Sequence, residues 1–377
     1  MIIREIEAKS ILRKHARIDS WFISHYGMNL YRGCAHNCAY CDGRAEGYYV
    51  EGEFGEAVSV KANAIEILRR ELDPQWKRTP FKRSFVLLGG GVGDSYQPAE
   101  KKYELARQTL ELLYELGFPV HVLTKSTLVT RDMDILKKIN QRAKTIVSFS
   151  FSSTSDEISR VVEPGVPAPS RRLETIEAIK NEGIACGAFL MPVIPFITDT
   201  AELMQESVSR MREAGVYFII FGGMTLKEGR QKDHFMKALG KHSPEISRKY
   251  QDIYKYSKWG EPVKEYTDIV NARFARIAVK HGIPMRIPFS LYSDILDTSD
   301  RIIVILEHID YLLKMRGENS SFGYGAYLFS QLSSPILQWQ EDMPGLKRVG
   351  QKVQAVIKEV IATGRSTYYE QLLGVSG

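Results

Sequence analysis

The sequence has few cysteines, no long apolar run and no strong excess of either charge. Cysteine makes up only 4 of the 377 residues, which argues against a fold held together by disulfides. No apolar stretch approaches the about 18 residues typical of a transmembrane helix, and Met1–Glu5 does not resemble the start of a secretory leader. We therefore expect a cytoplasmic protein that does not associate with membranes.

The net charge is too small to identify a partner. A formal charge of +6 and an isoelectric point near 8.9 permit a nucleic-acid substrate or an acidic electron donor without requiring either. Internal repeats and low-complexity tracts are also absent. With 44% hydrophobic residues, the chain is long enough for one large domain with appendages or for two domains.

Short apolar runs alternate with amphipathic segments over the first 225 residues. The runs predict strands at Phe85–Leu88, Val120–Thr124, Ile146–Ser150, Ile184–Met191 and Tyr217–Phe221. The segments between them predict helices near 98–116, 132–141, 170–182 and 200–214. This alternation is typical of a parallel sheet with helical crossovers. In such sheets, reactive groups gather at the C-terminal ends of the strands.

Beyond residue 226 the pattern becomes mainly helical. It predicts helices at 231–256, 262–281, 298–315 and 346–363, one short strand at Ile283–Phe289, and a loop over 317–345. We therefore divide the chain into an N-terminal extension (1–27), a strand–helix domain (28–225) and a C-terminal helical extension with one additional strand (226–377).

Three of the four cysteines, Cys34, Cys38 and Cys41, form a C-x3-C-x2-C run with Tyr40 before the last one. Three thiolates at this spacing can bind three irons of a four-iron cluster and leave the fourth iron open to a small molecule, unlike the closed four-cysteine clusters of electron carriers. The alternative is a zinc knuckle with His36 or Asp42 as fourth ligand. It is disfavoured because structural zinc sites usually join two separated ligand pairs.

Polar residues and glycines follow the predicted strands. Gly89–Asp94 offers unhindered backbone groups, and Lys125 emerges from an apolar strand, where an uncompensated charge would be costly. Ser148 and Ser150 alternate onto one strand face. Each feature also has an ordinary interpretation: a flexible turn, a solvated lysine, or hydroxyls bonded to the backbone. Cys186 lies mid-strand among apolar residues, which favours core packing over redox chemistry.

Taken together, these motifs resemble the radical S-adenosylmethionine (SAM) superfamily, and within it the proteins related to spore photoproduct lyase. The resemblance is carried by Asn29–Asp42, Gly91–Glu100, Thr124–Ser126, Ser148, Glu163–Leu173 and Met191–Asp199. It implies a partial (β/α)6 barrel with Cys34, Cys38 and Cys41 binding a 4Fe-4S cluster. It also implies SAM contacts from Gly91, Asp94, Lys125, Ser148 and Ile194. Either Arg171 or Arg172 could face the SAM carboxylate.

The resemblance further implies a reaction. In this superfamily an electron, supplied here by reduced flavodoxin or ferredoxin, splits SAM into methionine and a 5′-deoxyadenosyl radical that abstracts a hydrogen atom. Spore photoproduct lyase returns the hydrogen from a cysteine after the second strand, where this sequence has Gly90–Asp94. Its Cys-Tyr pair after the cluster loop is replaced by Cys41-Asp42. We therefore expect a related reaction without that donor and assign no further catalytic side chain.

Two other functions remain as alternatives at this stage. One is a non-catalytic iron–sulfur or zinc protein that binds nucleic acid. The other is a radical SAM enzyme that modifies a peptide or a small metabolite instead of a nucleic acid. Consumption of SAM separates the first alternative from an enzyme, because a binding module would not produce 5′-deoxyadenosine.

Overall fold

The fold was obtained as a computed structural model. The residues that it describes are 1–48, 50, 52–76, 81–242, 244–255, 257–332 and 349–374. None of the helices in this part of the chain is long and apolar enough to cross a membrane.

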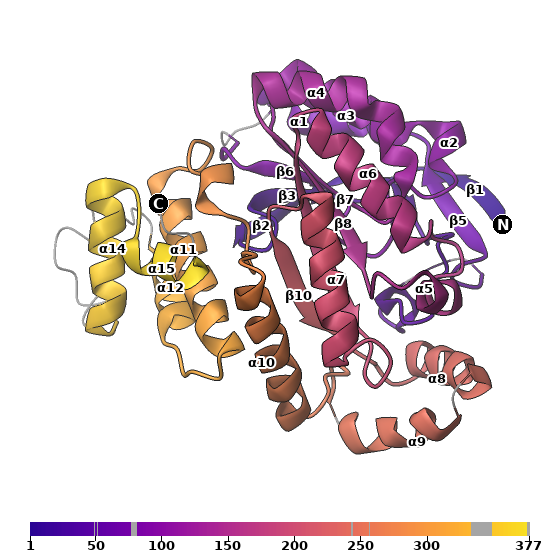
Figure 1. The fold of residues 1–377 in the computed structure, drawn as a ribbon. Coiled ribbons are helices and arrows are strands. Elements are labelled where there is room, and N and C mark those ends of the chain that lie inside the picture. Colours follow the sequence, from indigo (N-terminus) through magenta and orange to yellow (C-terminus); the bar gives the residue numbers. More distant parts are fainter. Residues whose placement is uncertain are drawn as a thin grey trace.

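In the described part of the chain, seven strands form the main sheet in the order β10-β9-β8-β7-β6-β3-β2 (Figure 1). They are β2 (Leu12–Asp19), β3 (Ser24–Met28), β6 (Phe85–Leu88), β7 (Val120–Thr124), β8 (Thr145–Phe151), β9 (Ala185–Val193) and β10 (Ile219–Gly223). All neighbours from β3 to β10 pair in parallel, and only β2 is antiparallel to its neighbour. The predicted α/β partial barrel is confirmed, and each predicted strand end lies within two residues of the observed one.

Helices cover the outer face of this sheet. They are α2 (Glu100–Tyr103), α3 (Leu105–Leu116), α4 (Met133–Arg142), α5 (Asp156–Val162), α6 (Pro169–Asn181) and α7 (Ala201–Ala214). Strand β6 is buried along its whole length, as expected for a parallel strand covered on both faces. The helix predicted at 98–116 is interrupted at Glu104, whose φ of 50° lies in the left-handed region.

A small second sheet contains the strand that leads into the cysteine loop. It contains β1 (Ile2–Ile6), β5 (Ala57–Lys61) and β4 (Tyr31–Arg32), in the order β1-β5-β4, and is followed by α1 (Ala64–Leu72). Strand β4 leads directly into Gly33 and Cys34. The main sheet already includes β2 and β3, so it begins before residue 28, where we placed the start of the barrel domain.

The C-terminal part is helical (Figure 1). Its helices are α8 (Arg230–His242), α9 (Pro244–Ile253), α10 (Lys264–Lys280), α11 (Thr298–Met315), α12 (Phe322–Ser330), α14 (Gln351–Thr363) and α15 (Thr367–Leu373). Helix α12 lies within the predicted loop, and residues 333–345 of that loop fall outside the described residues. The long helix predicted at 231–256 is two helices, and Pro244 begins the second of them.

The strand predicted at Ile283–Phe289 was wrong. This segment has no strand structure, although the Ile219 N–H of β10 donates to the Pro284 carbonyl at 2.9 Å. Pro284 and Pro288 both lack a backbone N–H, and a proline cannot donate to a sheet ladder. The segment therefore lies beside β10 without extending the sheet.

Candidate functional site

The three cysteines of the C-x3-C-x2-C run line one cavity. Cys34 and Cys38 are buried, Cys41 is partly buried, and none of them forms a disulfide. Gly33, with φ of +79°, precedes the loop, and a Cβ at this position would lie 2.6 Å from the Ala57 carbonyl oxygen. Only glycine therefore allows the chain to leave β4 in this direction.

Side chains distant in sequence fix the backbone of this loop. The Ala35 N–H donates to Gln97 Oε1 at 2.9 Å, and Gln97 Nε2 donates to the Gly33 carbonyl at 3.1 Å. Arg44 donates to the Cys38 carbonyl at 3.3 Å and to the Phe54 carbonyl at 3.0 Å. The sequence analysis missed both side chains, although Gln97 lies in the polar segment that it singled out.

The cavity has a volume of about 380 Å³, within the range of small-ligand sites. It opens between the cysteine loop and the C-terminal ends of the strands, where parallel sheets usually bind ligands. Its lining residues are Phe22, Cys34, His36, Cys38, Tyr40, Cys41, Asp42, Gly90, Gly91, Gly93, Asp94, Leu123, Thr124, Lys125, Ser150, Met191, Pro192, Gly223, Met224 and Thr225.

Three of the five predicted SAM contacts, Gly91, Asp94 and Lys125, line this cavity. Ser148 does not line it: its hydroxyl lies 2.8 Å from His121 Nε2 in the interior of the barrel. Ser150, two residues further along the same strand face, lines the cavity instead. Ile194 is fully buried in the same apolar cluster as Cys38, Ala39 and Tyr40 of the cysteine loop.

Asp94 joins the glycine-rich loop to the end of β7. Its carboxylate accepts hydrogen bonds from the Thr124 hydroxyl at 2.7 Å, the Lys125 N–H at 2.7 Å and the Tyr96 N–H at 2.8 Å. His36 Nδ1 lies 3.4 Å from the same carboxylate. These bonds hold the backbone on both sides of the cavity at a fixed separation.

A buried charged network lies directly behind Tyr40. The Glu163 carboxylate is 2.6 Å from Arg172 Nη2 and 2.8 Å from Lys125 Nζ, and it also accepts a hydrogen bond from the Tyr40 hydroxyl. Burial by itself would raise the pKa of Glu163, but Arg172 and Lys125 outweigh it and hold this pKa well below its ordinary value of 4.5. Arg172 is therefore the inward arginine, whereas Arg171 is exposed and pairs with Glu174.

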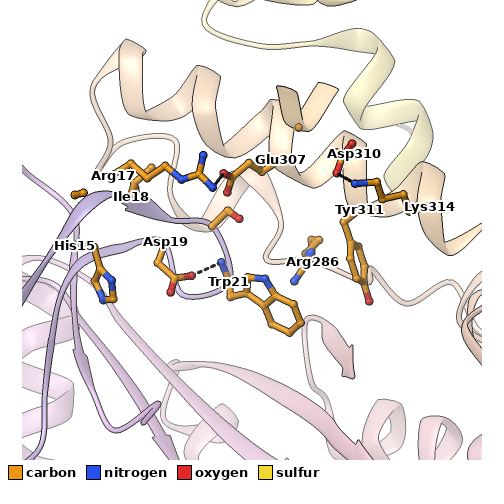
Figure 2. A pocket seen from close by; sticks show the side chains of 13 residues that line it. His15, Arg17, Ile18, Asp19, Trp21, Arg286, Glu307, Asp310, Tyr311 and Lys314 are labelled. Atoms are coloured by element: carbon orange, nitrogen blue, oxygen red, sulfur yellow. Dashed lines mark hydrogen bonds and ion pairs between the residues drawn. The ribbon is translucent and has the colours of Figure 1, made fainter. Parts of the chain in front are cut away.

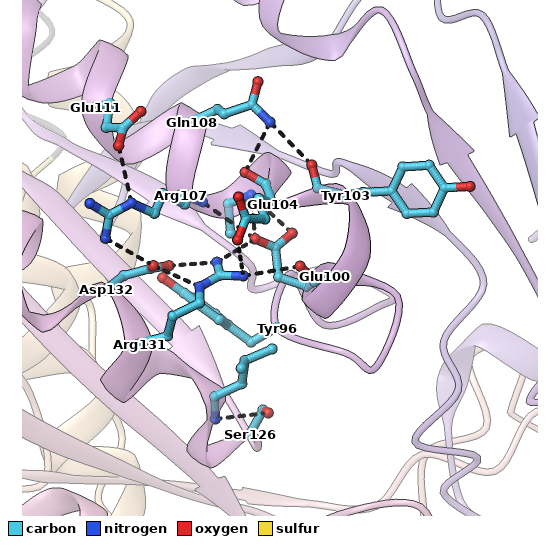
Figure 3. A network of polar contacts seen from close by, with 12 residues as sticks. Tyr96, Glu100, Tyr103, Glu104, Arg107, Gln108, Glu111, Ser126, Arg131 and Asp132 are labelled. Carbon is cyan, nitrogen blue, oxygen red and sulfur yellow. Dashed lines mark hydrogen bonds and ion pairs between the residues drawn. The ribbon is translucent and has the colours of Figure 1, made fainter.

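A second polar network supports the segment that follows the glycine-rich loop (Figure 3). Arg131 Nη2 donates to Glu100 at 2.7 Å, and the Ala106 N–H donates to the same carboxylate at 3.0 Å. Arg131 also pairs with Asp132 at 2.8 Å. The Tyr31 hydroxyl of β4 donates to Glu100 as well, so this network connects the strand before the cysteine loop to α2 and α3.

The protein's own charges do not ionise the cysteines. Burial, with Asp94 nearby, raises the pKa of the Cys34 thiol to about 12, and burial also raises the pKa of Cys38 and of Cys41. A bound metal deprotonates a coordinating thiol outright. In the described part of the chain, no three His, Cys, Asp or Glu side chains converge on a single ion. Three free, buried thiols on one cavity fit a cluster, in which each thiolate binds a different iron.

Cys186 lies outside this cavity. It is fully buried, and its Sγ is within 3.7 Å of the Ile176 carbonyl of α6, which confirms the predicted core packing. Among the described residues that line the cavity, the cysteines are Cys34, Cys38 and Cys41 alone.

The comparisons with known proteins concern the same region. The family model of the radical SAM superfamily matches residues 28–206. An uncharacterized protein of Mycobacterium tuberculosis is 32% identical over 262 residues, which cover 68% of this chain and 75% of the relative. An uncharacterized protein of Methanocaldococcus jannaschii is 28% identical over 222 residues, covering 59% of this chain and 78% of the relative.

Solved structures show a similar fold. A spore photoproduct lyase complexed with dinucleoside spore photoproduct has a TM-score of 0.56 at 14% identity, over 74% of this chain and 79% of that one. A variant of spore photoproduct lyase with bound SAM and dinucleoside spore photoproduct has a TM-score of 0.53 at 15% identity, over 72% and 78%. At these identities the likeness concerns the fold.

Proposed function

Because the chain belongs to the radical SAM superfamily, we propose that it is an enzyme that binds a 4Fe-4S cluster through Cys34, Cys38 and Cys41 and cleaves SAM reductively. When bound, the cluster and SAM would supply a 5′-deoxyadenosyl radical that abstracts a hydrogen atom from the substrate. The observation that carries the proposal is that three free thiols from one short loop line a single cavity with the polar ends of the strands.

The residues around this cavity suggest how SAM is held. Lys125 Nζ is a cation at the cavity wall and suits the SAM carboxylate. Gly91 offers backbone groups without a side chain, and Asp94 keeps that backbone in place through its bonds to Thr124 and Tyr96. Ser148 and Ile194 would act one layer further in, Ser148 through its contact with His121 and Ile194 through the buried cluster that contains Tyr40.

In this proposal Lys125 has two partners, the Glu163 carboxylate and the carboxylate of SAM. Its ammonium pairs with Glu163 at 2.8 Å and donates a hydrogen bond to the Tyr40 hydroxyl at 3.0 Å. A SAM carboxylate would add a further acceptor to the three donors of this group. The Glu163 pair positions Lys125 at the cavity wall, so that the ligand meets an oriented cation.

The hydrogen atom is returned differently from the way it is in spore photoproduct lyase. The end of β6 carries Gly89–Asp94 and no thiol, and Cys186 packs against α6. We therefore propose a reaction that ends without a cysteine donor on the protein. Reduced flavodoxin or ferredoxin is the proposed electron source, and nucleic acid, peptide and small metabolite are the substrate classes that the experiment below separates.

The test is anaerobic reconstitution with iron and sulfide, followed by dithionite and SAM. The proposal predicts 5′-deoxyadenosine from the wild-type protein and from Cys186→Ala, and none from Cys34→Ala. Extracts of cells grown in deuterated medium, separated into nucleic acids, peptides and small molecules, then identify the substrate class. The fraction that transfers deuterium into 5′-deoxyadenosine contains the substrate. A fully reconstituted protein that leaves SAM intact under all these conditions would contradict the proposal and favour a binding protein.

A further inference from the structure

A second cavity lies beside β2, at one edge of the main sheet (Figure 2). It has a volume of about 560 Å³ and lies between the end of β2 with its following turn, Arg286, and helix α11. Strand β2 is one edge of the sheet. The segment that carries Arg286 is attached to the other edge, β10, because the Ile219 N–H donates to the Pro284 carbonyl at 2.9 Å.

Arg286 is buried in this cavity wall, and its guanidinium has no polar partner in the part of the chain that the structure describes. Its side chain is 3% exposed. The guanidinium carbon lies 4.2 Å from the ring centre of Trp21 and 3.5 Å from that of Tyr311, and the planes of these two rings cross at 66° (Figure 2). Within the described residues, Nε and Nη1 have no hydrogen-bond acceptor, and the guanidinium forms no ion pair. Burial lowers the pKa of Arg286, as expected for a charge that lacks compensation.

Each carboxylate of the cavity has at least one partner of its own, although Asp310 Oδ1 is buried without one among the described residues. Asp19 accepts the Trp21 N–H at 2.8 Å, Glu307 pairs with Arg17 at 3.1 Å, and Asp310 pairs with Lys314 at 2.7 Å. Asp19 and Glu307 act on Arg286 only through space. Of the arginine and lysine side chains among the described residues that line the cavity, Arg286 is therefore the one without a carboxylate partner.

The chemistry of this arrangement points to an anionic ligand. A buried charge is costly unless it is paired and hydrogen-bonded. Aromatic faces attract a guanidinium but accept none of the hydrogen bonds that its N–H groups can donate within the ring plane. The planar N–H fork of arginine matches carboxylate and phosphate oxygens in a bidentate way. We propose that this cavity is an oxyanion site in which Arg286 binds the carboxylate or phosphate group of a small molecule.

The proposed oxyanion site and the cysteine cavity lie on either side of one turn. Trp21 lines the Arg286 cavity, and the next residue, Phe22, lines the cysteine cavity. The turn between β2 and β3 therefore separates the two. The oxyanion site does not depend on the proposed radical chemistry, because its residues lie outside the cysteine cavity and bind without SAM.

Thermal unfolding and tryptophan fluorescence test the site with inorganic phosphate in one arm and acetate in the other, both at constant ionic strength. In the wild-type protein one of the two anions should raise Tm and quench fluorescence in a saturable way, and that arm identifies the preferred oxyanion. Phosphate also stabilises proteins by being excluded from their surface. The informative quantity is therefore the difference between variants rather than the rise itself.

Arg286→Gln should lower the affinity for the preferred anion by about tenfold or more, as for the loss of a charge-assisted bidentate contact. Lys314→Gln is the matched control: it removes a paired cation from the same cavity and should change the affinity by less than about threefold. Equal anion affinities of the wild type, Arg286→Gln and Lys314→Gln would overturn the proposed site. If Arg286→Gln does not fold, Arg286→Lys replaces it. A wild-type protein without saturable quenching by either anion overturns the proposal independently of any variant.

Discussion

Arg172 and Arg286 are both buried and both lie beside aromatic rings, but their polar surroundings differ. Arg172 is fully buried, lies 4.7 Å from the ring centre of Phe151, and pairs with Glu163 at 2.6 Å. Arg286 is 3% exposed and lies against the rings of Trp21 and Tyr311, and it has no ion-pair partner among the described residues. Burial and aromatic contact are therefore similar, and the partner distinguishes the two.

The different surroundings of Arg172 and Arg286 imply different roles for the two regions. Around Arg172 the protein supplies both charges, and the Glu163 carboxylate also accepts the Tyr40 hydroxyl of the cysteine loop. This region is complete by itself, and it holds the loop and Lys125 in place. Around Arg286 the protein supplies a cavity and a cation that has no carboxylate partner among the described residues. The missing partner is then expected to come from a ligand.

The largest expected effect is on iron content. It distinguishes the three cysteines of the loop from residues elsewhere in the protein. Cys34→Ala, Cys38→Ala or Cys41→Ala should each lose most of the about four irons per chain of a cluster with three thiolate ligands. Cys186→Ala and Arg286→Met should keep them, because neither residue lies on the cysteine cavity. Metal analysis after anaerobic purification measures this. A single tightly held zinc with no iron after reconstitution would identify the loop as a zinc knuckle.

The next effect is on stability and tests the comparison of the two arginines directly. Glu163→Gln leaves Arg172 and Lys125 without their carboxylate and should cost about 3–5 kcal/mol of unfolding free energy. Glu174→Gln, which removes the exposed partner of Arg171, should cost less than about 1 kcal/mol. Arg286→Met should be close to neutral or stabilising, because it removes a buried charge that has no partner.

Urea unfolding at neutral pH gives all three values. The comparison fails if Glu163→Gln and Arg286→Met have the same effect, because the two regions would then be equally self-contained.

Acid should weaken the Arg172 region through protonation of Glu163. The folded-state pKa of Glu163 lies below its ordinary value of 4.5. Its contribution to stability is therefore fully present above pH 4.5 and is lost as the pH falls towards the folded-state pKa. The stability difference between the wild type and Glu163→Gln should shrink progressively below that pH, as measured by urea unfolding. A constant difference down to the acid limit would mean that Glu163 is not ionised in the folded protein.

A smaller effect concerns SAM. Lys125→Ala and Asp94→Ala should each weaken SAM binding by about tenfold while iron content stays near normal. Lys314→Ala, on the Arg286 cavity, should leave SAM affinity unchanged. Equilibrium dialysis of the reconstituted proteins decides between these outcomes. Unchanged affinity in both Lys125→Ala and Asp94→Ala would show that these residues only hold the protein's own network.

The smallest expected effect is a gain of activity towards dinucleoside spore photoproduct. The wild-type protein should not convert dinucleoside spore photoproduct efficiently, because a thiol donor is missing after β6. Gly91→Cys introduces one: the glycine has no positive φ, and a Cβ there lies 3.2 Å from the Asn29 amide, which must shift slightly. A low level of product from Gly91→Cys is expected, and chromatography of the dinucleotide detects it. Efficient turnover by the unmodified protein would show that it is a lyase with another donor.

The sequence predicted those parts of the molecule that depend on local patterns. Five strands followed from short apolar runs, and the loop of Cys34, Cys38 and Cys41 followed from spacing. The Tyr40–Glu163–Arg172 network joins residues more than 100 positions apart, and nothing local distinguishes Arg172 from Arg171. Ser148 and Ser150 share a strand face as predicted, but the alternation could not show that Ser150 lines the cavity while Ser148 contacts His121. Arg286 gave no signal, because only the folded chain brings it between Trp21 and Tyr311.

The most direct test of the central claim, a cluster with one open iron that binds SAM, is electron paramagnetic resonance of the reduced reconstituted protein with and without SAM. SAM should change the spectrum of the wild-type protein and of Cys186→Ala, because the three thiolates leave one iron free for the ligand. A four-iron spectrum that saturating SAM leaves unchanged would contradict it, since all four irons would then already be fully ligated.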